Sequence, residues 1–246
     1  MSVERGYIMK NNDLKFTLPM LEEPRPLRIR FRKTGDLQYI SHLDLQRTFA
    51  RVLVRAGLPL WYTKGFNPHI KMVFGLPLSV GTESECEFLD IRIERDMSEK
   101  EIKERLNGEV TEEMAVTAVY RPVRKFTDIA FAEYVYTVTA PGIAAACDRV
   151  RALFEGGPLV VLKRSKSGEK ETDIRPLIRR VTVEPSGDDL TVTAVLAAGE
   201  GGYLNPEYLI TVLREQTGLL TGDPVTERYR ILRRRVLLAD GETEFA

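Results

Sequence analysis

The feature that most constrains this sequence is a strict alternation of apolar and basic residues over Leu27–Arg32, which reads Leu-Arg-Ile-Arg-Phe-Arg. A period of two is typical of a β-strand that packs one face on a core and turns the other face to water. The apolar side chains of this strand are therefore predicted to lie in the core. Arg28, Arg30 and Arg32 are predicted to point outward, where a partner can reach them.

A helix is predicted to follow this strand. The run Ser41-His42-Leu43-Asp44 resembles a capping box in which Asp replaces the usual Glu or Gln, and Gly57 is a stop signal. Apolar residues repeat at helical spacing between these two signals. Arg47, Arg51 and Arg55 are spaced by four, so they are predicted to form a basic ridge on another face of the helix.

Strand and helix signals alternate in the order βαββαβ as far as Tyr120, and a similar order follows from Tyr134 to Leu238. This order predicts an α+β fold made of two tandem ferredoxin-like units with antiparallel sheets. The units are expected at residues 25–124 and 130–240. Residues 1–24 have no sustained period and are interpreted as a tail or docking arm.

The composition excludes several classes of protein. With 246 residues, 43% hydrophobic and 29% charged, the chain is typical of a soluble globular protein. It has no apolar run near the roughly 18 residues that span a bilayer and no secretory leader pattern, so a cytoplasmic protein without a membrane segment is expected. Two cysteines, Cys86 and Cys147, are too few for an iron–sulfur cluster or a Cys-rich zinc site, and inert thiols are the favoured interpretation.

Charge is unevenly distributed along the chain. Basic and acidic residues number 36 each, but the stretch from Arg25 to Lys71 has ten basic and two acidic residues, a net charge of +8. Such a stretch favours an anionic partner, for example a phosphate backbone. Further basic clusters occur at Arg175–Arg180 and Arg228–Arg235, where solvated strand faces are the alternative interpretation.

The only two histidines fall in the same segment, Tyr39–Gly81. His42 is expected in the first turn of its helix, where the positive end of the helix dipole favours a neutral imidazole. His69 follows the turn Gly65-Phe66-Asn67-Pro68. Either the pair takes part in substrate chemistry, or both are exposed structural histidines.

Two loops in this segment are candidates for binding. Phe66 is expected at the tip of a turn between Lys64 and Lys71, where an exposed aromatic ring can stack on a base; the alternative is a ring folded back as a lid on the core. The run Gly75–Gly81, with Pro77 inside it, is bounded by glycines. It either presents backbone amides to a ligand or forms a rigid structural turn, and it lacks the ending of a Walker loop.

Three motifs together carry a family resemblance: Tyr39-Ile40-Ser41-His42-Leu43-Asp44-Leu45, Gly65-Phe66-Asn67-Pro68-His69 and Gly75-Leu76-Pro77-Leu78-Ser79-Val80-Gly81. They resemble the radical-SAM-linked family of bacterial proteins, a domain of unknown function that occurs alone or fused after cobalamin-binding-type radical SAM proteins. The resemblance covers most of Leu27 to Leu238. It implies a radical SAM partner, and it implies that the iron–sulfur cluster and S-adenosylmethionine reside on that partner rather than on this chain.

These observations lead to one leading hypothesis and two alternatives. The leading hypothesis is a non-catalytic module that recognises RNA, either tRNA or ribosomal RNA, or presents a substrate to the radical SAM enzyme. The alternatives are metal-independent RNA cleavage by His42 and His69, to which CRISPR repeat-cleaving endoribonucleases offer an architectural similarity, and a protein–protein adaptor for the radical SAM subunit.

The residues assigned by the leading hypothesis fall into three sets. Phosphate contacts are predicted for Arg28, Arg30, Arg32, Arg47, Arg51, Lys64 and Lys71. Local substrate contacts are predicted for Tyr39, His42, Phe66, Asn67 and His69. Structural roles in the loops are predicted for Gly65, Pro68, Gly75, Pro77 and Gly81.

Overall fold

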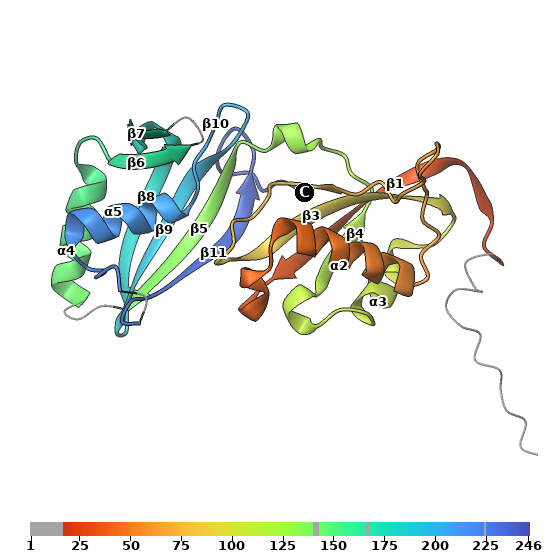
Figure 1. The fold of residues 1–246 in the computed structure, drawn as a ribbon, viewed down its shortest axis with the longest axis horizontal. Helices are drawn as coiled ribbons and strands as arrows, with labels where there is room; N and C mark the ends of the chain where they lie inside the picture. The colour runs from red at the N-terminus through yellow and green to blue at the C-terminus, as the bar shows by residue number, and fades with distance from the viewer. Residues whose placement is uncertain (1–16, 140–142, 166–167, 224) are drawn as a thin grey trace, which may run out of the picture. The chain divides into compact units, whose positions relative to one another are not determined.

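A computed structural model describes residues 17–139, 143–165, 168–223 and 225–246. The chain divides into two compact units, whose elements are labelled in Figure 1. The first unit holds the residues up to Val80 together with Glu87–Val123, and the second holds Gly81–Cys86 together with Arg124–Ala246. Strand β3 therefore begins in the second unit and continues in the first.

The first unit contains four strands and two α-helices among its described residues. In chain order they are β1 (Met20–Lys33), α2 (His42–Arg55), β2 (Val73–Phe74), β3 (Thr82–Arg95), α3 (Glu99–Asn107) and β4 (Val116–Tyr120). Short 3-10 turns at Gly35–Tyr39 and Glu112–Met114 join them. Strand β1 lies between β4 and β3, and β2 pairs with β3, so the strand order is β4-β1-β3-β2.

One hydrophobic core holds this unit together. The apolar residues of β1, Leu27, Ile29 and Phe31, are fully buried, as the alternating pattern predicts. They belong to the same buried cluster as Phe49 of α2 and Ile102 of α3. Because side chains of one strand parity meet residues of both helices in a single core, α2 and α3 cover the same face of the sheet.

Helix α2 begins and ends as its sequence indicates. The Oγ of Ser41 accepts a hydrogen bond from the backbone N–H of Asp44 at 3.1 Å, which satisfies one of the free donors of the first turn. Gly57 follows the helix with a φ of 65°, a left-handed conformation that glycine adopts without steric cost. The predicted helix boundaries are confirmed here.

The second unit is built around antiparallel strands. In chain order its elements are β5 (Phe131–Thr139), α4 (Ile143–Glu155), β6 (Val160–Ser165), β7 (Gly168–Asp173), β8 (Ile178–Ser186), β9 (Asp189–Gly199), β10 (Gly202–Tyr203), α5 (Glu207–Thr217) and β11 (Arg228–Leu237). The 3-10 turns Phe126–Asp128 and Arg175–Leu177 complete it. The strand order is β10-β9-β5-β11 followed by the first residues of β3, β8 pairs with β9, and β6 and β7 form a separate two-stranded sheet.

The predicted α+β class is confirmed, with four α-helices among the described residues and mostly antiparallel pairing. The first unit follows the predicted order βαββαβ. The second unit differs. A strand is expected at Leu159–Lys163 and is present as β6, but β7, which pairs with it, and the short strand β10 are additional elements. Within the second unit, the neighbouring strands β5 and β9 pair in antiparallel register.

Part of the predicted tail is a strand. β1 already begins at Met20, upstream of the alternating run at Leu27, so the last residues of the interval 1–24 belong to the sheet. Residues 1–16 lie outside the described part of the chain. Within the described residues, the helices are too short or too polar to cross a membrane.

A candidate ligand-binding surface on the first unit

A short loop, Thr63–His69, carries the exposed aromatic residue that the sequence singled out; we call it the Phe66 loop. The backbone N–H of Thr63 donates to the carbonyl of His69 at 2.9 Å, and the N–H of His69 donates to Thr63 Oγ1 at 3.1 Å. A bridge between Tyr62 and Ile70 continues this pairing. The two ends of the loop are thus tied together by hydrogen bonds, which holds the tip away from the core.

Phe66 is fully exposed at the tip of this loop. A ring that acted as a lid on the core would be largely covered, so the structure has the other predicted arrangement, in which the π-face is open to solvent. Gly65 precedes it with a φ of 141°, a conformation that other residues rarely adopt. Lys64, Asn67 and Pro68 are exposed beside it.

His69 helps to close the Phe66 loop. Its Nδ1 lies 3.2 Å from the carbonyl oxygen of Asn67 and 3.1 Å from Thr63 Oγ1. A carbonyl only accepts hydrogen bonds, so the ring donates to Asn67 through Nδ1–H. This ring has a structural role in the loop, and it is exposed.

His42 has a different set of partners. Its Nε2 lies 3.0 Å from the amide nitrogen of Gln46, one turn along α2. The amide nitrogen donates, so Nε2 of His42 accepts and its Nδ1 carries the proton. The ring also stands edge to face on Phe74 of β2 at a centroid distance of 5.3 Å.

The two histidines are therefore held by separate groups of residues, one on α2 and β2 and the other within the Phe66 loop. Acid–base cleavage needs both imidazoles within hydrogen-bond reach of one phosphate group. Among the described residues, the hydrogen-bond and ring contacts of His42 and His69 include no common partner.

The prediction that Arg28 points outward is wrong. Only 1% of Arg28 is exposed, and its guanidinium forks onto Asp90 of β3, with Nε to Oδ1 at 2.7 Å and a second bond to Oδ2 at 2.8 Å. β1 lies between β4 and β3, and side chains of both strands, Tyr120 and Asp90, lie beside Arg28 on this face of the sheet. Because the Arg28 guanidinium already binds a carboxylate through two hydrogen bonds, it is not available to a phosphate.

Arg30 and Arg32 are half-buried. The guanidinium carbon of Arg30 lies 6.0 Å from the centre of the Phe88 ring, so this side chain packs on the sheet. The period-two pattern identified the core side of β1 correctly. It carried no information about what covers the other side, because that depends on strands far away in the sequence.

The basic ridge of α2 is exposed, as predicted. Arg51 lies in solvent, and the side chain of Arg47 is 63% exposed with its guanidinium 3.3 Å from Asp44. The Ser41 hydroxyl donates a hydrogen bond to the Asp44 carboxylate at 2.7 Å. This hydrogen bond is the main reason why the pKa of Asp44 lies below its usual range, and Arg47 lowers the pKa further. An exposed pair of this kind is weak, so Arg47 remains available to a stronger anion.

Six of the predicted contact residues in the first unit thus lie exposed on one or another of its elements, and we call this set the first-unit surface. They are Arg47, Arg51, Lys64, Lys71, Tyr39 and Phe66. Of the glycine-bounded run, Gly75 donates its N–H to the Phe88 carbonyl at 2.9 Å and so extends the pairing of β2, while Pro77 is exposed. Gly81 belongs to the second unit and has a φ of 86°.

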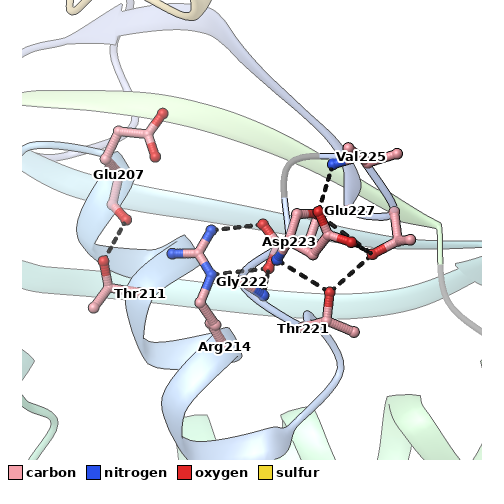
Figure 2. Close-up of polar contacts among 9 residues, drawn as sticks. Glu207, Thr211, Arg214, Thr221, Gly222, Asp223, Val225 and Glu227 are labelled. Atoms are coloured by element: carbon pink, nitrogen blue, oxygen red, sulfur yellow. Dashed lines mark hydrogen bonds and ion pairs between the residues drawn. The ribbon is translucent and has the colours of Figure 1, made fainter.

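A polar cluster that no sequence motif predicts lies at helix α5 of the second unit (Figure 2). Arg214 donates through Nε and a terminal nitrogen to the two carboxylate oxygens of Glu227, at 2.9 and 2.7 Å, and the N–H of Gly222 donates to the same carboxylate. The Arg214 hydrogen bonds lower the pKa of Glu227, whose side chain is only 5% exposed. The contacts tie the loop that precedes β11 to α5, a structural role.

Glu207 begins α5 in the same region. Burial raises the pKa of its carboxyl group, and Figure 2 shows that group turned away from the Arg214–Glu227 pair. No motif indicates this cluster in the sequence, because Arg214 and Glu227 are 13 residues apart and lie in different elements. Such a pairing becomes visible only when the fold is known.

The described part of the chain is a mixed α+β protein whose first unit carries exposed aromatic and basic side chains on several elements. A family model described as an uncharacterized protein conserved in bacteria (DUF2344) matches residues 26–206. The chain belongs to this family. A comparison with curated proteins finds no match. The family description names neither RNA nor a radical SAM enzyme, so both remain predictions.

Proposed function

We propose that this protein is a non-catalytic module that recognises RNA and presents it to a radical SAM enzyme. The observation that carries the proposal is Phe66, a fully exposed aromatic ring on a loop whose ends are tied by hydrogen bonds. Placing a large apolar side chain in water is unfavourable for the free protein. A base that stacks on the ring recovers this free energy, and single-stranded RNA offers such bases.

The charge around the ring supports the same ligand. Lys64 and Lys71 lie on either side of Phe66 in the sequence and are exposed, as are Arg47 and Arg51 on α2. Cationic groups beside an aromatic platform suit a strand whose phosphates alternate with bases. The tRNA or ribosomal origin of the RNA is part of the proposal.

The geometry favours recognition over cleavage by this chain. His42 and His69 each engage partners of their own, as described above, and His69 closes the loop that carries Phe66. In our proposal the chemistry is done by the partner. The resemblance of the sequence motifs to radical-SAM-linked proteins supports this partner, which would hold the iron–sulfur cluster and S-adenosylmethionine.

The same reasoning supports a cytoplasmic protein that works beside its partner. Cys86 and Cys147 are both buried, as the inert interpretation predicts, and two thiols alone do not complete a cluster site. The strand order β4-β1-β3-β2 supports a ferredoxin-like class for the first unit. The arrangement of this chain as two ferredoxin-like units in tandem is part of our proposal.

The Phe66 loop offers a direct test. In Phe66→Leu the side chain stays apolar but loses its π-face, and loss of one stacked base is expected to weaken RNA binding by about 1 to 3 kcal/mol, or roughly 5-fold to 150-fold. Phe66→Trp keeps the π-face and is expected to bind about as tightly as the unaltered protein. The measurement is fluorescence anisotropy with a labelled single-stranded RNA of about 12 nucleotides.

The matched control is Val123→Ala, which alters an exposed apolar side chain of the same unit outside the loop. It is expected to leave the RNA affinity unchanged. If Phe66→Leu and Phe66→Trp bind RNA equally well, stacking on this ring is not the basis of recognition. If the unaltered protein binds no RNA, the proposed function is wrong.

A further inference from the structure

A groove of about 480 Å³ lies between α4 and β8 of the second unit. We call it the arginine groove. It is lined by Arg151, Phe154 and Glu155 of α4, by Arg175, and by the β8 residues Ile178, Arg179, Arg180, Val181, Thr182 and Val183. All of these residues belong to the second unit, so the groove is formed within one compact body.

The lining of the arginine groove is strongly basic. It contains four arginines against the single carboxylate of Glu155. A larger cavity of the same unit, of about 660 Å³, differs in this respect, because Arg124 faces three carboxylates there, those of Asp128, Glu200 and Asp240. The arginine groove is thus the more basic of these two cavities.

Main-chain carbonyls hold three of the four guanidinium groups. Arg151 donates to the carbonyl of Val183 at 3.1 and 3.0 Å, and Arg175 donates to the carbonyl of Gly156 at 3.0 Å. Arg179 donates to the carbonyl of Asp240. A carbonyl orients a guanidinium without neutralising its charge, so these side chains are arranged in advance for an anion.

The carboxylates that lie near these arginines include Asp148, Glu133 and Asp240. The pKa of Asp240 is lowered mainly by its hydrogen bond from Thr243 and in part by Arg179. Asp148 lies 3.4 Å from Arg151, in a pair whose side chains are 80% and 45% exposed and which is therefore weak. Glu133 lies 4.0 Å from Arg180 but only 2.6 Å from Arg235, so it is mainly engaged by Arg235. The side chain of Arg180 is 50% exposed.

Part of this arrangement has a structural purpose. β8 pairs with β9 on one side only, and Arg151 covers the carbonyl of Val183 on the outer side. Charged side chains on such an edge also discourage pairing with another chain. That role accounts for Arg151, but it does not require Arg175, Arg179 and Arg180 to line the same groove.

We propose that the arginine groove binds phosphate groups of the RNA backbone, as a second contact that is separate from the first-unit surface. Planar guanidinium groups bind phosphate oxygens in pairs, and four of them in one groove fit successive phosphates better than a single small anion. This proposal rests on the proposed function for its ligand. It assigns a binding role to the basic cluster Arg175–Arg180 and adds Arg151 of α4 to it.

The experiment measures RNA affinity of the full chain against salt concentration. The double variant Arg175→Gln with Arg180→Gln removes two phosphate contacts and leaves Arg151 in place. For single-stranded RNA each lost contact lowers the slope of log K against log salt by about 0.7, so a change of about 1.4 is expected. This slope corresponds to roughly 25-fold weaker binding at 0.1 M salt, with no difference at 1 M.

The matched control is Arg149→Gln with Arg234→Gln, which removes the same charge from exposed positions outside the groove. It is expected to keep the slope of the unaltered protein. If the first double variant is poorly folded by circular dichroism, Arg175→Lys with Arg180→Lys is used. That variant is expected to keep the slope of log K against log salt, because lysine keeps the positive charge. It is expected to bind RNA more weakly, because lysine lacks the paired N–H donors of the guanidinium.

The possible outcomes separate this proposal from the proposed function. A slope that is unchanged in the groove variants, while Phe66→Leu weakens binding, overturns the arginine groove alone. A shallower slope in the groove variants, with no effect of Phe66→Leu, supports the groove and counts against recognition by the Phe66 loop. Groove-dependent binding of inorganic pyrophosphate without any change in the RNA slope indicates a site for small phosphate compounds, and it also overturns the proposal.

Discussion

Arg28 and Phe66 have exposures opposite to those that their side-chain chemistry favours. The charged residue is 1% exposed and the apolar ring is fully exposed. Arg28 can be buried because its guanidinium donates two hydrogen bonds to the Asp90 carboxylate. These bonds offset the cost of removing the charge from water. Phe66 has no such compensation in the free protein, and this is why its exposure points to a ligand.

The pairing of Arg28 leads to a stability prediction. Arg28→Ala leaves Asp90 without its main partner in a partly buried site, so the free energy of unfolding is expected to fall by about 3 kcal/mol. Arg51→Ala, which removes an exposed arginine of the same unit, is expected to change it by less than about 0.5 kcal/mol. Chemical denaturation monitored by circular dichroism compares the two variants.

RNA affinity provides the second half of this comparison. Under conditions in which it is folded, Arg28→Ala is expected to bind RNA as the unaltered protein does, whereas Arg51→Ala binds more weakly. The account of Arg28 as a structural residue is wrong if the Ala variant keeps its stability and loses RNA affinity.

At the scale of elements, the sequence indicated some boundaries well and others poorly. Helix α2 was predictable because its cap Ser41, its apolar stripe and its stop at Gly57 are all local signals. Strand β7 was not, because Gly168–Asp173 is a nearly continuous exposed and polar segment that has no core face to produce an alternation. It is a strand only because β6 pairs with it.

The loop that carries Phe66 shows a similar division. Gly65, Asn67 and Pro68 predict a turn, and a turn is present. The direction of the Phe66 side chain was left open, since an apolar ring beside a core can fold back or point outward. The structure has the outward arrangement, on a loop whose ends are joined by hydrogen bonds between Thr63 and His69.

The start of α5 leads to a prediction about pH. Burial raises the pKa of Glu207 above its unfolded value, so the native state favours the protonated carboxyl and loses stability as the pH rises through this pKa. Glu207→Gln removes the ionisation. The variant is therefore expected to be more stable than the unaltered protein at pH 7, and the difference is expected to vanish below about pH 4.

Glu227 provides the opposite case in the same cluster (Figure 2). The Arg214 hydrogen bonds lower its pKa, so its contribution to stability is present above the unfolded pKa and is lost as the pH falls through the native one. Glu227→Gln is expected to cost about 1 to 3 kcal/mol at pH 7 and less in acid. Thermal melts of both variants between pH 3 and pH 8 test the signs, and equal pH profiles would contradict this account.

At the scale of the whole molecule, the fold class followed from the sequence but the pairing of the strands did not. Strand and helix patterns alternate visibly along the chain, which is enough to indicate an α+β protein. The parallel pairing of Ile231 with Thr82 joins residues that are far apart in the sequence, and no local pattern announces it. For the same reason the chain divides at Val80, Cys86 and Val123 rather than at a simple boundary near its centre.

The candidate site was predictable to a similar extent. The basic stretch from Arg25 to Lys71 and the turn at Phe66 led to the first-unit surface, since charge and turn chemistry are local properties. Burial is not local, so Arg28 was misplaced. The arginine groove was recognisable only as a basic cluster at Arg175–Arg180, because Arg151 joins it through the packing of α4 on β8.

The central claim is that this protein recognises RNA through Phe66 for a radical SAM partner. The most direct measurement is crosslink-and-sequence profiling in cells that contain the partner, comparing the unaltered chain with Phe66→Leu. We expect specific RNA to crosslink to the unaltered chain and to fall several-fold in the variant. Recovery of no RNA above background from the unaltered chain, with the partner present and co-purified, would contradict the claim and favour a protein–protein adaptor.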